Sequence, residues 1–361
     1  MAVKKKRKAK PLLIILIILA ILSLSAGITW MVLSSPIDKN NTAKVEVIIP
    51  NGTTTRQIGV ILKQKGLIRS ELFFNIYIKL NRPSPMKAST YTMTKNMSLD
   101  EIIKILESGN NYNPDVISIT FKEGERITDF CKTISKKTNH SYDDAIAKMK
   151  DKAYIQTLIS KYWFLSDEIL NDSIYYPLEG YLAPNTYQFT NKDVSIEAII
   201  ETMLKQTDKI LTKYKSKMTS PVHYYVTMAS MAELEGTNTE NRKQIVNVFE
   251  NRLAKGMNLG SDVTTYYAFG VDMGERDLYQ KELDTENPYN TRGPNMIGKL
   301  PIGPICNPSK DAIVAAFEYT ETDALYFVAD KYGDVYFTRN DEEHVQMIRK
   351  LKDDGLWYTY D

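Results

Sequence analysis

The longest apolar stretch of the chain runs from Leu12 to Leu33, 22 residues without a charged side chain. At about 1.5 Å per residue, a helix of this length covers roughly 33 Å, enough for a hydrocarbon core of about 30 Å. Lys4–Lys10 directly precedes it, so the positive-inside rule places the N-terminus in the cytoplasm. The pattern predicts a cytoplasmic basic tail (1–11), a transmembrane helix (12–33) and a single-pass protein of the cell membrane, with its remaining residues outside the cytoplasm.

A cleaved signal peptide is the alternative, because Ser23 and Ser25 are small residues of the kind that a signal peptidase requires. The apolar run continues beyond them to Leu33, which favours a retained anchor. Residues 34–43 are polar and contain Pro36, which is typical of a linker.

Beyond the linker, short segments of alternating polarity and segments of helical period follow one another, which is typical of a mixed α+β fold. The predicted strands are Val45–Pro50, Ser89–Thr94, Val116–Phe121, Ala324–Val328 and Val335–Thr338. The predicted helices are Thr54–Gln64, Glu71–Leu80, Leu99–Leu106 (ended by Gly109), Ser195–Lys215, Thr239–Ala254 and Glu342–Lys352. Tyr175–Thr190 is dense in Tyr, Pro and Gly, so we expect an ordered loop there.

A further helix is predicted between Ser220 and Gly236, with Ser220 as its cap and Pro221 in its first turn. Its apolar positions form one stripe at i, i+3, i+4 and i+7: Val222, Tyr225, Val226 and Ala229. Four residues further along that stripe stands Glu233. Burial and the negative end of the helix dipole should both raise its pKa. A carboxyl group that is partly protonated near neutral pH can act as a general acid.

The residues alone leave ordinary roles open for Glu233, such as a buried partner of an arginine or a surface residue at a helix end. Glu235 lies two residues on, about 200° around the helix, so the two carboxyl groups cannot share a substrate unless the helix breaks. Thr237 and Glu240 have the spacing of a capping box that opens the next helix.

Composition excludes several classes of protein. The chain has 361 residues, room for two or three domains, with 46 Lys and Arg against 44 Asp and Glu. Six of the cations lie in the first ten residues, so the rest is slightly acidic and a poor nucleic-acid binder. Two cysteines, Cys131 and Cys306, exclude a disulfide scaffold and a zinc site built from cysteines, and three histidines argue against a multi-histidine metal centre. We expect free thiols, no metal and no cofactor.

Polar loops fill much of the last third of the chain: Asn258–Tyr267, Asn287–Arg292 and Leu300–Pro308. Their Ser, Thr, Asn, Asp and Tyr side chains suit sugar hydroxyls and amides, although ordinary loop chemistry explains them equally well.

Five segments in this order resemble the endolytic murein transglycosylase family, the YceG-like proteins. They are VEVIIPNGTTTRQIGVILKQKGLI (45–68), LEGYLAPNTYQF (178–189), MASMAELEG (228–236), NPYNTR (287–292) and LPIGPICNPS (300–309). The chain departs from the family pattern at Leu234, Gly260, Val263 and Tyr336, which bears on individual sugar contacts more than on the reaction class.

The resemblance implies a LysM-like glycan-binding module (44–110) and a catalytic domain (111–361) with a helical region at about 125–215 and a core at about 216–352. It implies a lytic transglycosylase that cleaves peptidoglycan glycan strands, with peptidoglycan synthases or the elongation and division machinery as partners. Glu233 would be the acid and then the base, leaving a 1,6-anhydromuramoyl end without a second carboxylate. The supporting or substrate-binding residues would be Glu235, Ser261, Asp262, Tyr289, Asn290, Thr291 and Asn307.

Three alternatives remain open at this point. A glycan hydrolase would pair Glu233 with a second acid, for which Asp262 is the best candidate. A non-enzymatic scaffold would only bind the wall. A membrane-anchored sensor is the weakest alternative, because about ten cytoplasmic residues leave little to signal with.

Overall fold

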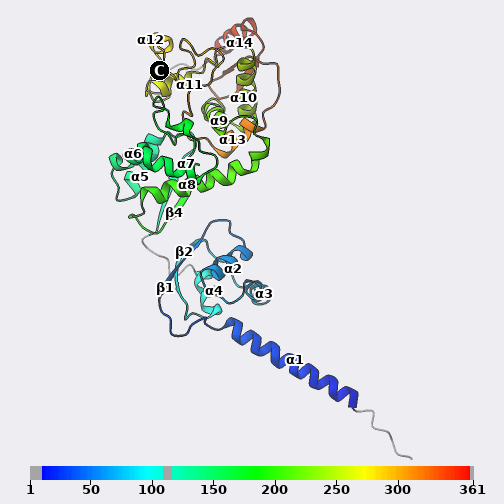
Figure 1. Cartoon of the computed structure of the whole chain (residues 1–361). Helices are drawn as coiled ribbons and strands as arrows, with labels where there is room; N and C mark the ends of the chain where they lie inside the picture. Colours follow the sequence, from blue (N-terminus) through cyan, green and yellow to red (C-terminus); the bar gives the residue numbers. More distant parts are fainter. Residues whose placement is uncertain (1–9, 109–115, 358–361) are drawn as a thin grey trace, which may run out of the picture. The chain divides into compact units, whose positions relative to one another are not determined.

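The structure is a computed structural model that describes residues 10–108 and 116–357. The chain divides into two compact units, Met1–Val116 and Ile117–Asp361 (Figure 1). Each unit has its own hydrophobic core. Both units combine helices with small antiparallel sheets, so the predicted α+β class is confirmed. Most of the basic tail (residues 1–9) and Gly109, the expected helix end, lie outside the described residues.

The first unit consists of α1 (Lys10–Ser34), β1 (Lys44–Ile49), α2 (Thr55–Gln64), α3 (Glu71–Asn81), β2 (Ser89–Thr94) and α4 (Leu99–Ser108). Strands β1 and β2 pair antiparallel, with Lys44 opposite Thr94 and Ile49 opposite Ser89. Thr54 caps α2 in a capping box with Gln57. The predicted strands and helices between residues 44 and 108 are confirmed to within two residues at each described end.

The C-terminal end of helix α1 and the segment after it contact the rest of the first unit. The Trp30 ring stacks on Tyr77, with centroids 5.3 Å apart, and Arg69 donates hydrogen bonds to the carbonyls of Ser35 and Pro36. The segment expected to be a linker is therefore held in place at its start.

No helix in the described part of the chain is both long enough and apolar enough to cross a membrane.

The second unit begins with β3 (Ile117–Phe121), α5 (Ile127–Lys137), α6 (Tyr142–Lys150), α7 (Lys152–Lys161), η1 (Asp167–Leu170), β4 (Asn185–Phe189), α8 (Ile196–Leu211) and η2 (Thr212–Lys217). It continues with α9 (Val222–Glu235), α10 (Thr239–Ala254), α11 (Asp262–Ala268), α12 (Gln280–Asp284), α13 (Lys310–Phe317), β5 (Tyr326–Ala329), β6 (Val335–Thr338) and α14 (Asp341–Asp353). Strands β3 and β4 pair antiparallel, as do β5 and β6.

Helix α9 lies at the centre of this unit and contacts α10, α11 and α13 (Figure 1). Every residue from Tyr225 to Glu233 is buried. The expectation of one apolar face is therefore wrong, because neighbouring helices cover α9 on several sides. The expected end of the helix at Gly236 is confirmed.

Three local expectations are also corrected. The loop expected at Tyr175–Thr190 contains β4, in which the Tyr187 and Phe189 side chains are buried. Helix α9 has Pro221 rather than Ser220 at its N-cap position. Helix α10 is capped by Asn238, because the Thr237 hydroxyl instead donates to the Gly333 carbonyl.

Gly180 stands where two chain segments approach closely. Its φ is +84°, and a Cβ added there would lie against Pro304 and 2.8 Å from Val226 Cγ1. Gly274 has the same φ, but a Cβ there would meet nothing within 4 Å. Alanine variants at these two glycines therefore separate the cost of backbone strain from the cost of steric overlap.

We expect Gly180→Ala to lower the free energy of unfolding by several kcal/mol, since about 1–2 kcal/mol of backbone strain and about 1–3 kcal/mol of overpacking add. Gly274→Ala should show the backbone cost alone. Urea denaturation of the full chain measures both, and equal losses in the two variants would contradict the close packing at Gly180.

Candidate functional site

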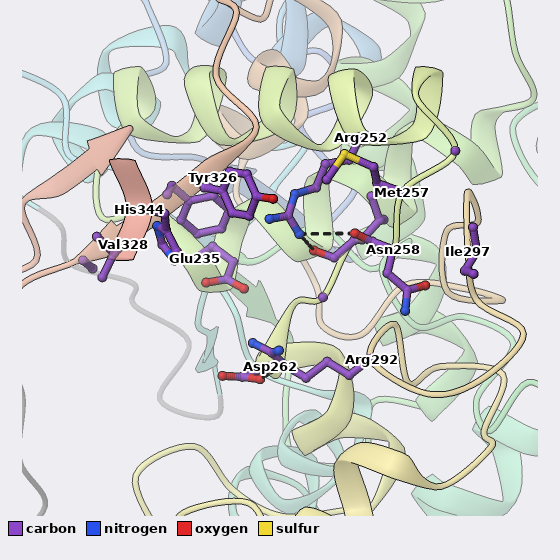
Figure 2. Close-up of a pocket in the computed structure, with 15 residues that line it drawn as sticks. Glu235, Arg252, Met257, Asn258, Asp262, Arg292, Ile297, Tyr326, Val328 and His344 are labelled. Carbon is purple, nitrogen blue, oxygen red and sulfur yellow. Dashed lines mark hydrogen bonds and ion pairs between the residues drawn. The ribbon is translucent and has the colours of Figure 1, made fainter. Parts of the chain in front are cut away.

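The end of helix α9 opens into two cavities of about 780 and 900 Å³. Both are lined by Glu235, Asp262, Arg292 and Ala329, so they meet at these residues. Figure 2 shows Glu235 on one wall of the first cavity, with Asp262 and Arg292 across from it. A substrate could therefore occupy space on both sides of the Glu235 carboxyl group.

Glu235 accepts one hydrogen bond from a described side chain, from the Ser261 hydroxyl at 2.6 Å. Burial raises the pKa of Glu235 to about 7, and the nearby Asp262 carboxylate adds to this effect. The Ser261 hydrogen bond and the charge of Arg292 act in the opposite direction. This carboxyl group can therefore both give and take a proton near neutral pH.

Ser261 is itself held by a chain of hydrogen bonds. Its backbone N–H donates to Thr291 Oγ1 at 3.0 Å, and its carbonyl accepts from the Thr264 hydroxyl at 2.6 Å. The Thr264 and Thr291 hydroxyls lie 2.8 Å apart. Asn290 supports the same region by donating to the carbonyls of residues 282, 283 and 285. Asn290 and Thr291 were both predicted for the site: Thr291 holds Ser261 directly, and Asn290 fixes the neighbouring loop.

Arg252, Tyr326 and His344 complete the first cavity, and motif reasoning did not single them out (Figure 2). The Arg252 guanidinium lies 4.7 Å from the Tyr326 ring centre, and it donates to the carbonyls of residues 258, 259 and 325. The imidazole of His344 stacks on Tyr326 at 5.2 Å. Burial, with the charge of Arg252, lowers the pKa of His344 and favours its neutral form.

Glu233 lies in a different environment and lines neither cavity. Its Oε1 accepts from Arg242 Nη2 at 2.8 Å, and its Oε2 accepts from the Ser309 N–H at 3.0 Å and the Ser309 hydroxyl at 2.5 Å. Burial raises its pKa, while Ser309 and Arg242 oppose this shift. The arrangement matches one of the ordinary roles left open by the sequence, a buried glutamate paired with an arginine.

Tyr289 and Asn307 lie in the interior rather than on a cavity wall. The Tyr289 ring packs between Tyr175 and Tyr267, with centroids 4.8 Å from each. Asn307 accepts from the N–H groups of Gly180 and Leu182, and it donates to Glu179 at 2.9 Å. These two residues join loops to one another.

Asp262 lines both cavities and forms a close ion pair with Arg292. About half of each side chain is exposed. Asp262 therefore already has a cationic partner at the point where the two cavities meet.

Glu179 is a second buried acid that motif reasoning passed over, although it lies in the quoted segment 178–189. Burial raises the pKa of Glu179 to about 8. It accepts from the Ile127 N–H, Tyr267 and Asn307, which places it in the core.

Both cysteines are buried free thiols, as expected. Within residues 10–108 and 116–357, no three His, Cys, Asp or Glu side chains gather as metal ligands would.

The site defines a protein of α+β fold with one carboxyl group of raised pKa at the meeting point of two open cavities. Residues 47–350 match the YceG-like family. The chain is 38% identical over 317 residues to a Bacillus subtilis (strain 168) protein named endolytic murein transglycosylase, covering 86% of each protein.

Two more comparisons point to the same family. A protein of the same name from Streptococcus pneumoniae serotype 2 (strain D39) is 35% identical over 328 residues, which are 86% of this chain and 58% of that protein. A crystal structure of a yceG-like protein from Listeria monocytogenes is 36% identical, with a TM-score of 0.60, covering 84% of this chain and 99% of that one. This chain belongs to the YceG-like family.

The buried Arg242–Glu233 pair and the exposed Arg292–Asp262 pair allow a matched test of stability. We expect Arg242→Met to cost about 3–5 kcal/mol of unfolding free energy, because it leaves a buried carboxylate without its cation. Arg292→Met should cost less than about 1 kcal/mol, since water solvates Asp262. Urea unfolding at neutral pH measures both; a loss in Arg242→Met as small as in Arg292→Met would show that Glu233 needs no internal counter-charge.

Proposed function

We propose that this protein is an endolytic murein transglycosylase that cleaves peptidoglycan glycan strands, with Glu235 as its general acid and base. A single structural feature supports this role: the Glu235 carboxyl group borders both cavities and has a pKa of about 7. The names of the relatives in Bacillus subtilis and Streptococcus pneumoniae support the reaction class.

The chemistry needs one carboxyl group used twice. Protonated Glu235 donates its proton to the glycosidic oxygen of the β-1,4 bond between N-acetylmuramic acid and N-acetylglucosamine, and that bond breaks. The muramoyl acetamido group stabilises the positive charge at C1, which departs from the scheme of two carboxylates. The Glu235 carboxylate then takes the proton of the muramoyl 6-hydroxyl, whose oxygen bonds to C1 and closes the 1,6-anhydro ring.

Glu235 suits these steps better than Glu233, which the sequence favoured. Both carboxyl oxygens of Glu233 already accept hydrogen bonds, from Arg242 and from the two donors of Ser309, and Glu233 lines neither cavity. Glu235 has one hydrogen bond from Ser261 and open space beside it. We propose that Glu233 positions helix α9 against α10 and α13.

Two other functions, a glycan hydrolase and a scaffold that binds the wall, can be distinguished from the proposed one. A hydrolase would use Asp262 beside Glu235, but the Asp262 carboxylate is engaged in an ion pair with Arg292. A scaffold that only binds the wall would not need a carboxyl group with a pKa near neutrality in its groove.

We expect Glu235→Gln to lower the rate of glycan cleavage by about 10²–10⁴-fold, because the amide cannot donate or accept the proton. Glu233→Gln should keep most of the activity per folded molecule. Digestion of purified glycan strands by the full chain, with mass spectrometry of the new ends, measures the rates and identifies the reaction.

The ends formed by the unsubstituted chain should be 1,6-anhydro ends, whereas reducing ends would identify a hydrolase. Loss of cleavage in Glu233→Gln with full cleavage in Glu235→Gln would reverse the roles of the two residues. Full cleavage in both variants would show that neither glutamate takes part in the reaction.

Ser261→Ala should move the alkaline limb of the pH–activity profile to higher pH. The Ser261 hydroxyl stabilises the Glu235 anion, so its loss raises the pKa of the acid and extends the protonated form above pH 7. Ser309→Ala removes the matching hydroxyl from Glu233 and should leave the limb in place. The pH dependence of kcat/KM measures both, and a shift in Ser309→Ala alone would point to Glu233.

We also propose that the protein is held at the cell membrane by its apolar segment 12–33, with the second unit outside the cytoplasm. The basic residues at 4–10 and the uncharged run that follows support this orientation. The LysM-like identity of the first unit, its binding to glycan and contacts with peptidoglycan synthases belong to the same proposal.

Removal of residues 1–33 should release the protein from the membrane fraction of cells that express it. In intact protoplasts, protease added outside should degrade the full chain beyond residue 34. Protection of the chain in intact protoplasts, with cleavage only after lysis, would place the site in the cytoplasm.

A further inference from the structure

Helix α3 carries an apolar stripe that faces away from the core of the first unit. Leu72, Ile76 and Leu80 stand four residues apart, so they share one side of the helix. Their exposed fractions are 69%, 44% and 65%, although the same helix buries Phe73 and Phe74 in the core. Three aliphatic side chains exposed along one side of a helix are typical of a contact surface.

The stripe adjoins the place where α3 meets α1. The Trp30 ring of α1 lies 5.1 Å from the Phe73 ring and 5.3 Å from the Tyr77 ring, measured between ring centres. Phe73 follows Leu72 and Tyr77 follows Ile76, and one residue is a turn of about 100° around a helix. The stripe therefore lies along the edge of the contact between α3 and α1.

The last turns of α1 are also apolar and exposed. The exposed fractions of Ile28, Met31 and Val32 are 55%, 71% and 51%. These residues belong to the uncharged segment 12–33, which we propose as the membrane anchor. Two helices of the first unit that contact each other through Trp30 thus both present aliphatic side chains to the surroundings.

The side chains around the stripe suit the boundary between lipid and water. Trp30 and Tyr77 are of the aromatic types enriched at that boundary, and the Tyr77 hydroxyl donates to Asp100 Oδ1 at 3.4 Å. Lys79 and Arg82 are exposed at the C-terminal end of α3. Their long side chains can cover acyl chains while their charged ends reach lipid phosphates.

These features favour a lipid surface as the partner of the stripe. If segment 12–33 lies in the bilayer, Trp30 stands near its outer surface, and the contact with Trp30 holds α3 at the same level. We propose that Leu72, Ile76 and Leu80 dock on the outer surface of the cell membrane, with their side chains among the lipid acyl chains. This inference rests on the proposed membrane anchor and adds a second membrane contact, which fixes the orientation of the first unit on the bilayer.

The test is a depth measurement on the full chain in vesicles of phosphatidylglycerol and phosphatidylethanolamine. A fluorescent nitrobenzoxadiazole label is attached to Ile76→Cys, and the chain without an added cysteine gives the background from the buried Cys131 and Cys306. Glu71→Cys is the matched control, because Glu71 is exposed on the same helix but about 140° around it from Ile76. We expect nitroxide-labelled lipids to quench the label at position 76 about 3-fold or more above position 71, and iodide in the water to show the opposite order.

Replacing Leu72 and Leu80 with Ser in the Ile76→Cys background should reduce quenching by lipid about 2-fold or more, because two of the three lipid contacts are lost. Both side chains are exposed, so circular dichroism spectra should match the parent. If this variant does not fold, the comparison of positions 71 and 76 decides alone. Equal quenching by lipid at those two positions would overturn the docking.

Two further outcomes separate the docking from its alternatives. Blue-shifted emission at position 76 that lipid nitroxides do not quench, and that is lost when the protein is diluted in the vesicles, would identify a second copy on the stripe and overturn the proposal. Flotation of the vesicles after an alkaline wash tests the anchor separately. A chain that floats without quenching at position 76 keeps the anchor and loses the docking, whereas a chain that does not float overturns both.

Discussion

The geometry of helix α9 sets the chemistry of this protein. Successive residues of an α-helix are rotated by about 100°, so two glutamates separated by one residue point in nearly opposite directions. Leu234 separates Glu233 from Glu235 at the C-terminal end of α9, so one carboxyl group faces the packed interior and the other faces the groove. The same short segment therefore places one carboxyl group among interior partners and the other at the border of the cavities.

Their surroundings decide how each carboxyl group behaves. A buried carboxylate is costly unless cations or hydrogen-bond donors replace water. Glu233 receives three such contacts, from Arg242 and Ser309, which link α9 to α10 and α13. Among the described residues Glu235 receives one, from Ser261, and burial keeps its neutral form accessible near pH 7. The threonines around Ser261 hold that one donor in place.

Much of the local structure followed from sequence, because caps, glycines and apolar periods act over a few residues. Thr54, Ser195 and Gly236 all stand at the helix boundaries expected of them. The prediction of Glu233 rested on the family resemblance and on an apolar stripe along one face, and the stripe assumes that the other face meets water. Helix α9 is buried all round between Tyr225 and Glu233, so its apolar pattern does not reveal which face meets the groove.

The remaining features depend on contacts between distant parts of the chain. Arg242 stands nine residues after Glu233 on another helix, and no local spacing predicts that they pair. Ser261 lies 26 residues after Glu235 in the sequence but donates a hydrogen bond to it. His344, on α14, lines the first cavity with Glu235. Within the motif segments, Tyr289 and Asn307 lie in the core, whereas Ser261 contacts Glu235 and Asp262 borders the groove. Only the folded structure distinguishes the residues of the core from those at the groove.

The most direct test of the central claim is the pKa of Glu235 itself. Carbon NMR of the protein with ¹³C-labelled glutamate carboxyl groups, titrated from pH 4 to 9, would follow each acid, and the signal missing from Glu235→Gln identifies the residue. This account predicts that the signal titrates near pH 7. A midpoint near the ordinary glutamate value of about 4.3 would contradict it, because the carboxyl group would then hold no proton to donate at neutral pH.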